Sequence, residues 1–464
     1  MDNQLINATL LLITYTDQSH GVLGQKGNPL MWTYYDYDEN WYSALCQVFS
    51  CVYRYDLGLR ASHLGLVGAN EDIINVAEMY HPKYMFYPAG SYDISTDTLM
   101  RLREIGCIVV GRFEDDDYRF DDHSKWLIPY LDYCITNVPG RVPQYEALGA
   151  RCIPLPIEGH NEAIWQRLPH IPKKFDVSFA GLVYPHRHKL LESLRGLGIP
   201  VQVFDNTGGG NLLSLRDLVW VINATRINLN LTLDRYVPGL RQTKGRPFEI
   251  TLSGGFVLTE YAPDLEKYFE IDRELVCFED IKEAAQKIEY YLSHPDEREA
   301  IAERGYMRAC RDYTTKVVYR DLFLRIEDDL NRHGRAVPER ESTVALKIRE
   351  NPLRKNIAER HYQWGRLLFS VHTPLHRAWR ETIEVAIQND PYHRKARLAL
   401  TTYGARWYIG DKILPFIRLA SFVKRKVLYL LSKINLRKKQ VTEDKENHSR
   451  DSGNDSEKIP TASD

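Results

Sequence analysis

The stretch VPGLRQTKGRPFEITLSGGFVLTE, residues 237–260, gives the strongest indication of the fold in this chain. A loop rich in glycine and cations leads into a short helix-forming stretch, 246–255, which stops at two glycines before the apolar run 256–260. A helix followed directly by a buried strand is the unit from which parallel sheets are built, because parallel strands need crossover connections. The stretch therefore predicts an α/β domain around it.

Outward from this segment, apolar runs alternate with helix-like stretches in two successive blocks. In the first block we expect strands at 8–15, 83–89, 107–113 and 131–137 and helices at 42–49 and 95–106. In the second block we expect strands at 175–181, 200–205, 225–232 and 256–260, helices at 186–198, 215–223 and 246–255, and then consecutive helices over 278–330. Such alternation predicts two doubly wound, Rossmann-like α/β domains, with the ligand between them at the carboxyl ends of the strands.

The domain limits are placed where these patterns change. The first domain is expected at 1–165 and the second at 170–335, after a break rich in proline and lysine. Strand patterns then disappear, which predicts a helical extension at 340–440. Residues 441–464 have almost no apolar side chains, and we expect them to be disordered.

Composition defines the class of protein. The chain has 464 residues, of which 44% are hydrophobic, and these values fit large globular cores and exclude collagen and a wholly disordered chain. The seven cysteines never occur as C-x-x-C, so we expect reduced thiols rather than disulfides or a zinc site. The N-terminus has no basic export signal, and the predicted location is the cytoplasm.

Charge is distributed unevenly although the formal net charge is only -1. Residues 391–440 hold 13 lysines and arginines and one acid. Within them, 411–439 places apolar side chains at helical intervals, with cations on the other side. This segment either lies on an anionic membrane, at its inner face, as an interfacial helix, or packs on the protein body. Nucleic acid is not an expected partner, because no recognisable binding module accompanies these cations.

Two helix starts in the second block combine glycine with cations. One begins at Arg246, after a loop that carries Arg241 and Lys244, and the other begins near Arg187, after Gly181 at the end of a strand. Unpaired backbone N–H groups and the helix dipole favour anions at such a place. We therefore expect phosphate binding at these two helix starts.

Glu249 lies one turn into the helix that begins at Arg246. A carboxylate there is placed to accept two hydroxyl hydrogen bonds, as from a ribose diol. The alternative is an exposed basic loop in which Glu249 only complements the helix dipole. We include Gly254 and Gly255, which end the helix, among the expected binding residues.

The acidic run 114–117 follows the apolar strand 107–113 and has three interpretations. It resembles an Asp-x-Asp metal site, in which carboxylates hold Mg²⁺ or Mn²⁺ on a diphosphate. It is also placed to supply a general base for an acceptor hydroxyl, for which Asp115 is our candidate. The third interpretation is a solvated acidic turn. His20, in a glycine-rich loop after the first strand, is a further candidate near the acceptor.

Residues 176–315 resemble the group 1 glycosyltransferase module of CgeB-like, spore maturation-type proteins. The first half resembles the family more loosely. The matching stretches are DVSFAG…HR (176–187), TRINLNLT (225–232), KGRPFEITLSGGFVLTE (244–260), DLEKYFE (264–270) and YYLSHPDEREAIAERG (290–305), and in the first half GRFEDDDYRF (111–120), YLDYCITN (130–137) and YEALGARCIPLPIE (145–158).

The resemblance implies a GT-B fold, whose second domain binds a nucleotide-sugar and whose first domain binds the acceptor. It matches Glu249 to the carboxylate that holds the donor ribose. It matches Arg187, with Lys244 or Arg241, to the cations that hold the diphosphate. The family commonly carries a second glutamate eight positions before the first, where this chain has Arg241, so retention of anomeric configuration does not follow here.

The predicted function is therefore a glycosyltransferase that moves a sugar from a nucleotide-sugar donor to a hydroxyl acceptor, with no obligatory cofactor or metal. The acceptor is expected to be a glycan, a lipid-linked molecule or a protein, in the synthesis of cell-surface polysaccharide or glycoconjugate. Catalytic roles fall to Lys244, Arg241 and Asp115. The alternatives are a non-catalytic nucleotide- or sugar-binding protein and a nucleotide-sugar epimerase of the same fold.

Overall fold

The computed structural model describes residues 5–14, 38–89, 93–155, 159–205, 213, 215–234, 237, 239–243, 245–335, 352–370, 376–390 and 393–401. The predictions for His20, Lys244, the basic segment 411–439 and the tail 441–464 lie outside these residues. The chain divides after His393 into two units. The first unit holds both sheets. Within the described residues, the second unit contributes helix α15, Arg394–Thr401.

Six parallel strands form the first sheet, in the order β2-β1-β3-β4-β5-β6. The strands are β1 Ile6–Thr14, β2 Phe49–Asp56, β3 Tyr84–Pro88, β4 Ile108–Phe113, β5 Tyr133–Thr136 and β6 Cys152–Pro154. The α-helices among them are α2 Ser43–Leu45, α3 Leu57–Tyr80, α4 Thr96–Ile105, α5 Asp116–Arg119 and α6 Val142–Ala147. Helix α4 begins as predicted, because Ser95 Oγ accepts a hydrogen bond from the N–H of Thr98 at 3.0 Å.

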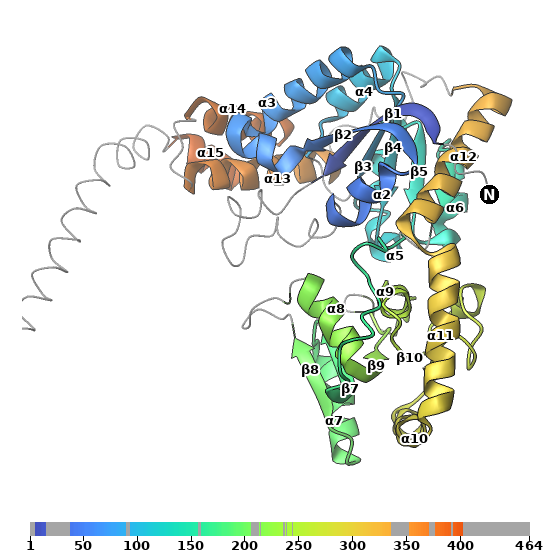
Figure 1. Cartoon of the computed structure of the whole chain (residues 1–464). Coiled ribbons are helices and arrows are strands. Elements are labelled where there is room, and N and C mark those ends of the chain that lie inside the picture. The colour runs from blue at the N-terminus through green and yellow to red at the C-terminus, as the bar shows by residue number, and fades with distance from the viewer. Residues whose placement is uncertain are drawn as a thin grey trace, which may run out of the picture. The chain divides into compact units, whose positions relative to one another are not determined.

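Five parallel strands form the second sheet, in the order β11-β10-β9-β7-β8. The strands are β7 Phe175–Gly181, β8 Val201–Asp205, β9 Thr225–Asn230, β10 Val257–Glu260 and β11 Val276–Phe278. Its helices are α7 Pro185–Gly196, α8 Leu215–Ala224, α9 Arg246–Leu252, α10 Ile281–Ser293 and α11 Pro295–Asp312. Two parallel sheets with flanking helices confirm the predicted fold class (Figure 1).

Helix α12, Thr315–His333, follows α11 but packs into the core of the first sheet (Figure 1). The ring of Phe323 lies 4.8 Å from that of Phe49 and 5.2 Å from that of Tyr84. The chain thus returns from the second sheet to the first through α12. The limits 1–165 and 170–335 stay predictions.

The two segments that connect the sheets pair with each other. His160 and Thr314 form a parallel bridge, in which the N–H of His160 donates to Tyr313 O and the N–H of Thr315 donates to His160 O, both at 3.0 Å. The preceding Gly159 has φ 73°, and a Cβ there would lie 2.7 Å from the Cα of Thr315. Only glycine fits this left-handed position without displacing the neighbouring backbone.

The predicted helical extension is present as α13, Pro352–Ser370, and α14, His376–Asn389, which pack on α3. Its anchor is the buried carboxylate of Asp93, which pairs with Arg360 and accepts a hydrogen bond from Trp364 Nε1 at 2.9 Å. A buried carboxylate needs such partners to offset the cost of its desolvation. Helix α13 is therefore attached to the first sheet's side of the molecule by a specific polar contact.

The structure corrects the expected helix at 42–49. Only Ser43–Leu45 is α-helical there, after a π-helical turn at Asp38–Tyr42, and Phe49 already begins strand β2. Strand β2, helix α3 and the short elements α5, α6, β6 and β11 were not among the expected elements. The boundaries of the other expected elements differ from the observed ones by a few residues.

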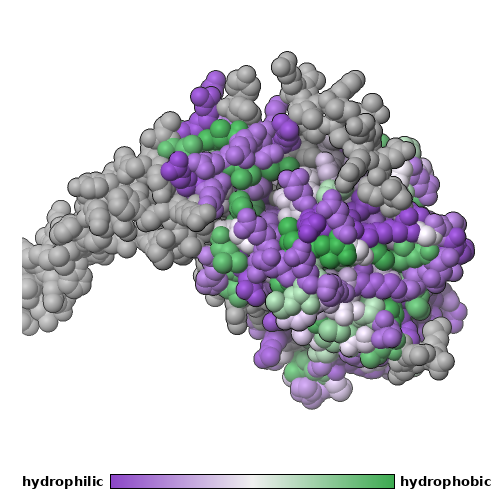
Figure 2. All heavy atoms as spheres, turned by 90° about the horizontal axis from the view of Figure 1, so that it is seen from above, coloured by the Kyte–Doolittle hydropathy of each residue, from purple (hydrophilic) through white to green (hydrophobic). Residues whose placement is uncertain are grey.

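The surface seen from above mixes hydrophilic residues with smaller, separate groups of hydrophobic ones (Figure 2), which is ordinary for a protein surface. No helix within the described residues is long and apolar enough to cross a bilayer. All seven cysteines are free thiols.

Candidate active site

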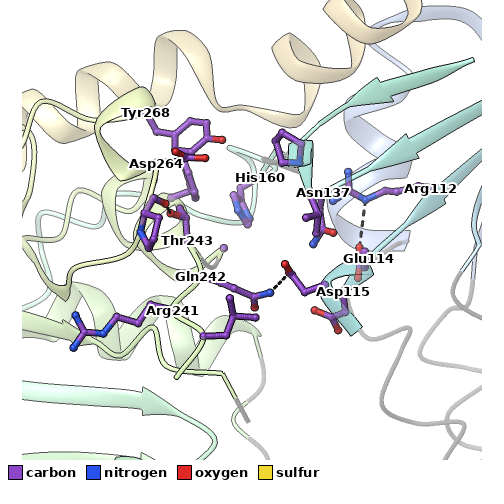
Figure 3. Close-up of a pocket in the computed structure, with 17 residues that line it drawn as sticks. Arg112, Glu114, Asp115, Asn137, His160, Arg241, Gln242, Thr243, Asp264 and Tyr268 are labelled. Carbon is purple, nitrogen blue, oxygen red and sulfur yellow. Dashed lines mark hydrogen bonds and ion pairs between the residues drawn. The ribbon is translucent and has the colours of Figure 1, made fainter. Parts of the chain in front are cut away.

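A pocket of about 390 Å³ lies between loops that follow strands of both sheets (Figure 3). Loops after β4 and β5 line it from the first domain, and loops after β9 and β10 line it from the second. The lining residues are Arg112, Glu114, Asp115, Asp117, Asn137, Val138, Pro139, His160, Leu240, Arg241, Gln242, Thr243, Gly245, Phe248, Pro263, Asp264 and Tyr268. Both sheets thus present the carboxyl ends of their strands to one cavity, which is the predicted place for a ligand.

A direct hydrogen bond joins the two sides of the pocket. The side-chain amide of Gln242, from the second domain, donates to the carboxylate of Asp117, from the first. Among the described residues, groups from both domains are therefore close enough together to contact a single bound molecule.

The acidic run 114–117 separates into residues with different surroundings. Asp116 is fully buried, and its carboxylate accepts hydrogen bonds from three hydroxyl groups, so it stabilises the fold and does not line the pocket. The three donors are Ser124, Thr136 and Tyr145. Glu114 lies 3.3 Å from the guanidinium of Arg112 at the pocket wall (Figure 3).

Asp115 takes the left-handed conformation, with φ 57°, where β4 gives way to α5. Its carboxylate lines the pocket and accepts a hydrogen bond from the hydroxyl of Tyr118 at 2.9 Å. Across the described ranges, no group of three or more His, Cys, Asp or Glu side chains is arranged to hold a metal ion.

Of the predicted cations, Arg241 lines the pocket. Its guanidinium lies 3.4 Å from Glu260 and 3.3 Å from Glu279, so acidic groups already neutralise part of its charge. That Arg241 binds the diphosphate of the donor stays a prediction.

Arg187 occupies a different environment, beside the loops after β7 and β9. Its two terminal nitrogens donate to the carbonyl oxygens of Leu182 at 3.0 Å and Leu231 at 2.9 Å, and the guanidinium lies 4.6 Å from the ring centre of Tyr184. Burial lowers the pKa of Arg187. The side chain holds two loops together and does not line the pocket.

Arg246 and Glu249 form an ion pair at the start of α9. The Glu249 side chain is 13% exposed, and burial raises its pKa while Arg246 opposes the rise. Its Oε2 accepts from Arg246, whereas Oε1 lies 3.7 Å from the place where a Cβ on Gly245 would stand. Glu249 does not itself line the pocket, but Gly245 does, so Oε1 is the oxygen of this carboxylate that lies beside the pocket wall.

The start of α9 offers fewer free backbone N–H groups to an anion than the sequence indicated. The helix is short, its second residue is Pro247, which lacks an N–H, and the N–H groups of Phe248 and Glu249 donate to Gly245 O. Side chains must therefore supply most of the binding there.

The remaining predicted glycines do not line the pocket. A Cβ on Gly254, whose φ is 71°, would lie 2.7 Å from the side chain of Arg167, and one on Gly255 would lie 2.8 Å from Ile250. Gly181 stands at the end of β7, where a Cβ would lie 3.3 Å from the ring of Phe179. Close packing explains Gly254 and Gly255 without a ligand.

His160 was missed by the sequence interpretation, although it lies in the middle of the pocket (Figure 3). It belongs to the segment between the two sheets, which pairs with the returning chain at Thr314. Its position next to Gly159 was the only indication in the sequence. Asn137 and Gln242, which also line the pocket, were missed because they lie in loops without a distinctive pattern.

Comparison with known proteins finds a family match over the second sheet. Residues 164–323 match the family described as glycosyl transferase-like. This glycosyltransferase domain confirms the predicted class of activity, and it covers the second sheet together with α11 and part of α12. No curated protein matches the sequence.

Several solved structures resemble the chain distantly. Anabaena Alr3699/HepE in complex with UDP and glucose is 11% identical and covers 69% of this chain and 100% of its own, with a TM-score of 0.44. Sucrose-phosphate synthase from Thermosynechococcus elongatus is 10% identical and covers 70% of this chain and 100% of its own, also with a TM-score of 0.44. A glycosyltransferase from Rickettsia africae is 10% identical, covers 70% and 99%, and has a TM-score of 0.43.

Proposed function

We propose that this protein transfers a sugar from a nucleotide-sugar to a hydroxyl acceptor in the pocket between the two sheets. The observation that supports this most is the composition of the pocket wall. Glu114, Asp115 and Asp117 come from the first domain, and Arg241, Gln242, Gly245 and Asp264 come from the glycosyltransferase domain. The donor is placed at the second domain and the acceptor at the first.

The proposed donor contacts are made by side chains of the second domain. Oε1 of Glu249 accepts hydrogen bonds from the ribose diol, and Arg246 holds the carboxylate in place. Arg241, and Lys244 by its place in the sequence, stabilise the negative charge that develops on the leaving diphosphate. Arg187, which does not line the pocket, supports the loop after β9.

A nucleotide screen tests this function. In a thermal-shift assay with UDP, GDP, ADP and dTDP, at least one nucleotide is expected to raise the melting temperature, because a ligand at a hundred times its Kd stabilises the fold by about 2.7 kcal/mol. The matching nucleotide-sugar is then expected to release nucleoside diphosphate when a glycan, lipid-linked or protein acceptor is added. Stabilisation without release indicates the non-catalytic alternative, a changed sugar without an acceptor indicates an epimerase, and no stabilisation by any nucleotide contradicts the proposal.

Two finer assignments rest on the sequence. Membership of the CgeB-like, spore maturation-type subgroup is supported by the stretches 176–187 and 244–260. With that subgroup we associate the synthesis of a cell-surface polysaccharide or glycoconjugate.

Activity does not require a metal in this proposal, so a chelator is expected to leave turnover unchanged.

We further propose that 411–439 attaches the protein to the inner face of an anionic membrane, through cations that contribute about 1 kcal/mol each near the surface. The full chain is expected to float with phosphatidylglycerol vesicles and not with phosphatidylcholine vesicles. Deleting 411–464 is expected to abolish flotation while leaving nucleotide binding intact. Loss of nucleotide binding on truncation would show instead that the segment packs on the body of the enzyme.

A further inference from the structure

The imidazole of His160 is held in a fixed position in the wall of the pocket. Its backbone is paired on both sides with the segment around Thr314. Its ring stacks on Phe248 at 6.4 Å and meets the edge of Trp165 at 5.8 Å. Trp165 is fixed in turn, because its Nε1 donates to Asn40 at 3.1 Å. The ring therefore has little freedom to turn away from the cavity.

Neither ring nitrogen of His160 has a hydrogen-bond partner among the described residues, although the residue is only 1% exposed. Buried polar atoms in folded proteins nearly always have a partner, and an exception calls for an explanation such as a bound molecule. The open space next to this ring is the pocket itself. A Cβ on Gly245 would stand 3.6 Å from Nε2, so this glycine, which lines the pocket, lies directly beside that edge of the buried ring.

The charge state of the ring restricts what it can bind. Burial, with the nearby Arg246 and Arg112, lowers the pKa of His160 to about 3, so the imidazole is neutral near pH 7. A neutral imidazole has one N–H donor and one nitrogen acceptor. Phosphate oxygens at this pH act almost entirely as acceptors and would leave one nitrogen unpaired. Hydroxyl groups both donate and accept, so a polyol suits both nitrogens.

The position of His160 favours the donor side of the pocket. Its nearest neighbours in the cavity wall, Gly245 and Phe248, belong to the glycosyltransferase domain. The same Cβ position on Gly245 lies 3.7 Å from Oε1 of Glu249, the proposed ribose ligand. A nucleotide held by Glu249 would therefore bring the rest of the donor close to this ring.

We propose that His160 binds a hydroxyl group of the donor sugar and so distinguishes a nucleotide-sugar from the free nucleotide. This inference rests on the proposed function. It adds a sugar-binding residue, from the segment between the domains, that the sequence motifs do not contain.

The test compares His160→Phe and His160→Gln with the wild type, using UDP-glucose and UDP, or GDP-mannose and GDP if the uridine pair does not bind. Phenylalanine keeps the stacking on Phe248 and removes both hydrogen-bonding nitrogens, whereas glutamine retains a donor and an acceptor. In H160F the affinity for the nucleotide-sugar is expected to fall about threefold to tenfold, with the affinity for the free nucleotide unchanged within about twofold. H160Q is expected to recover part of the loss.

The melting temperature without ligand separates binding from structure. H160F is expected to melt no lower than the wild type, because it removes two unpaired buried nitrogens. The matched control is His123→Phe, since the buried ring of His123 contacts the carbonyl oxygen of Ala89 and does not line the pocket. H123F is expected to melt lower and to bind both ligands normally.

Three results would overturn the proposal. An equal loss of affinity for nucleotide and nucleotide-sugar would assign His160 to the phosphates. Unchanged affinity for both would show that the ring does not contact the donor, while the proposed function would stand. A wild type that binds none of the four nucleotides of the thermal-shift screen would refute the proposed function, and this inference with it.

Discussion

Replacing Glu249 by alanine is expected to weaken the binding of the nucleoside diphosphate at least tenfold. The carboxylate is proposed to accept two hydrogen bonds from the ribose diol, and each hydrogen bond to a charged group contributes about 1.5–3 kcal/mol. Since 1.4 kcal/mol corresponds to a factor of ten, loss of one such bond already gives this change. Isothermal titration calorimetry with the nucleotide identified by the screen measures it directly.

The matched control for this prediction is Glu283→Ala. Glu283 also lies in the first turn of a helix of the second domain, α10, where it pairs with Lys287 at 2.8 Å. If Glu249 only complements a helix dipole, the two substitutions should have equally small effects on nucleotide binding. Ribose binding predicts a loss for Glu249 alone.

Removal of Glu249 also leaves Arg246 without its carboxylate partner. Glu249→Gln keeps the size of the side chain and serves if the alanine variant does not fold. A folded variant that binds the nucleotide as tightly as the wild type would refute the ribose assignment, whatever its catalytic rate.

The parallel sheets could be predicted because most of their strands are short, mainly apolar runs. Residues 10–14 of β1 and 108–113 of β4 are buried on both faces in the structure, as strands between two layers of helices must be. Strand β2 was not predicted because it lies at the edge of the sheet and carries exposed polar side chains. Among the described strands it pairs only with β1.

Helix α3 was not predicted for a different reason. It contains Gly58, Gly65 and Gly68, and glycine disfavours a helix by about 1 kcal/mol per residue. Burial of Leu66 and Ile73 against the sheet and helices outweighs this propensity, and Gly65 sits in a kink with φ 75°. Tertiary packing of this kind cannot be recognised from local sequence.

The location of the site could be predicted from the sequence, but which side chains enter the pocket could not. The order of strands and loops puts the run 114–117 and the loop at 239–243 at the cleft, and both are found there. Which carboxylate of the run enters the pocket depends on the left-handed backbone of Asp115, which turns Asp116 into the core. His160 depends on a backbone pairing with Thr314, more than 150 positions away in the sequence.

The geometry of the acidic run leads to the second large effect. In Asp115→Asn, kcat is expected to fall about 100-fold to 10,000-fold, because an amide cannot accept the proton of the acceptor hydroxyl. Nucleotide affinity should stay unchanged, since Asp115 lies on the first-domain side of the pocket, away from the proposed donor contacts. Steady-state rates of nucleoside diphosphate release, with and without acceptor, measure the change.

Asp117→Asn is the matched control, because Asp117 lines the same pocket but is hydrogen-bonded to Gln242. A general base at Asp115 requires that D115N lose far more activity than D117N, and that a chelator leave the wild type active. If both variants lose activity equally and the chelated enzyme recovers only when Mn²⁺ or Mg²⁺ is added, the two carboxylates act as metal ligands, and the assignment of Asp115 as a base is wrong. If D115N turns over normally, the base must be sought elsewhere on the pocket wall, and Asp115 serves only to shape the turn between β4 and α5.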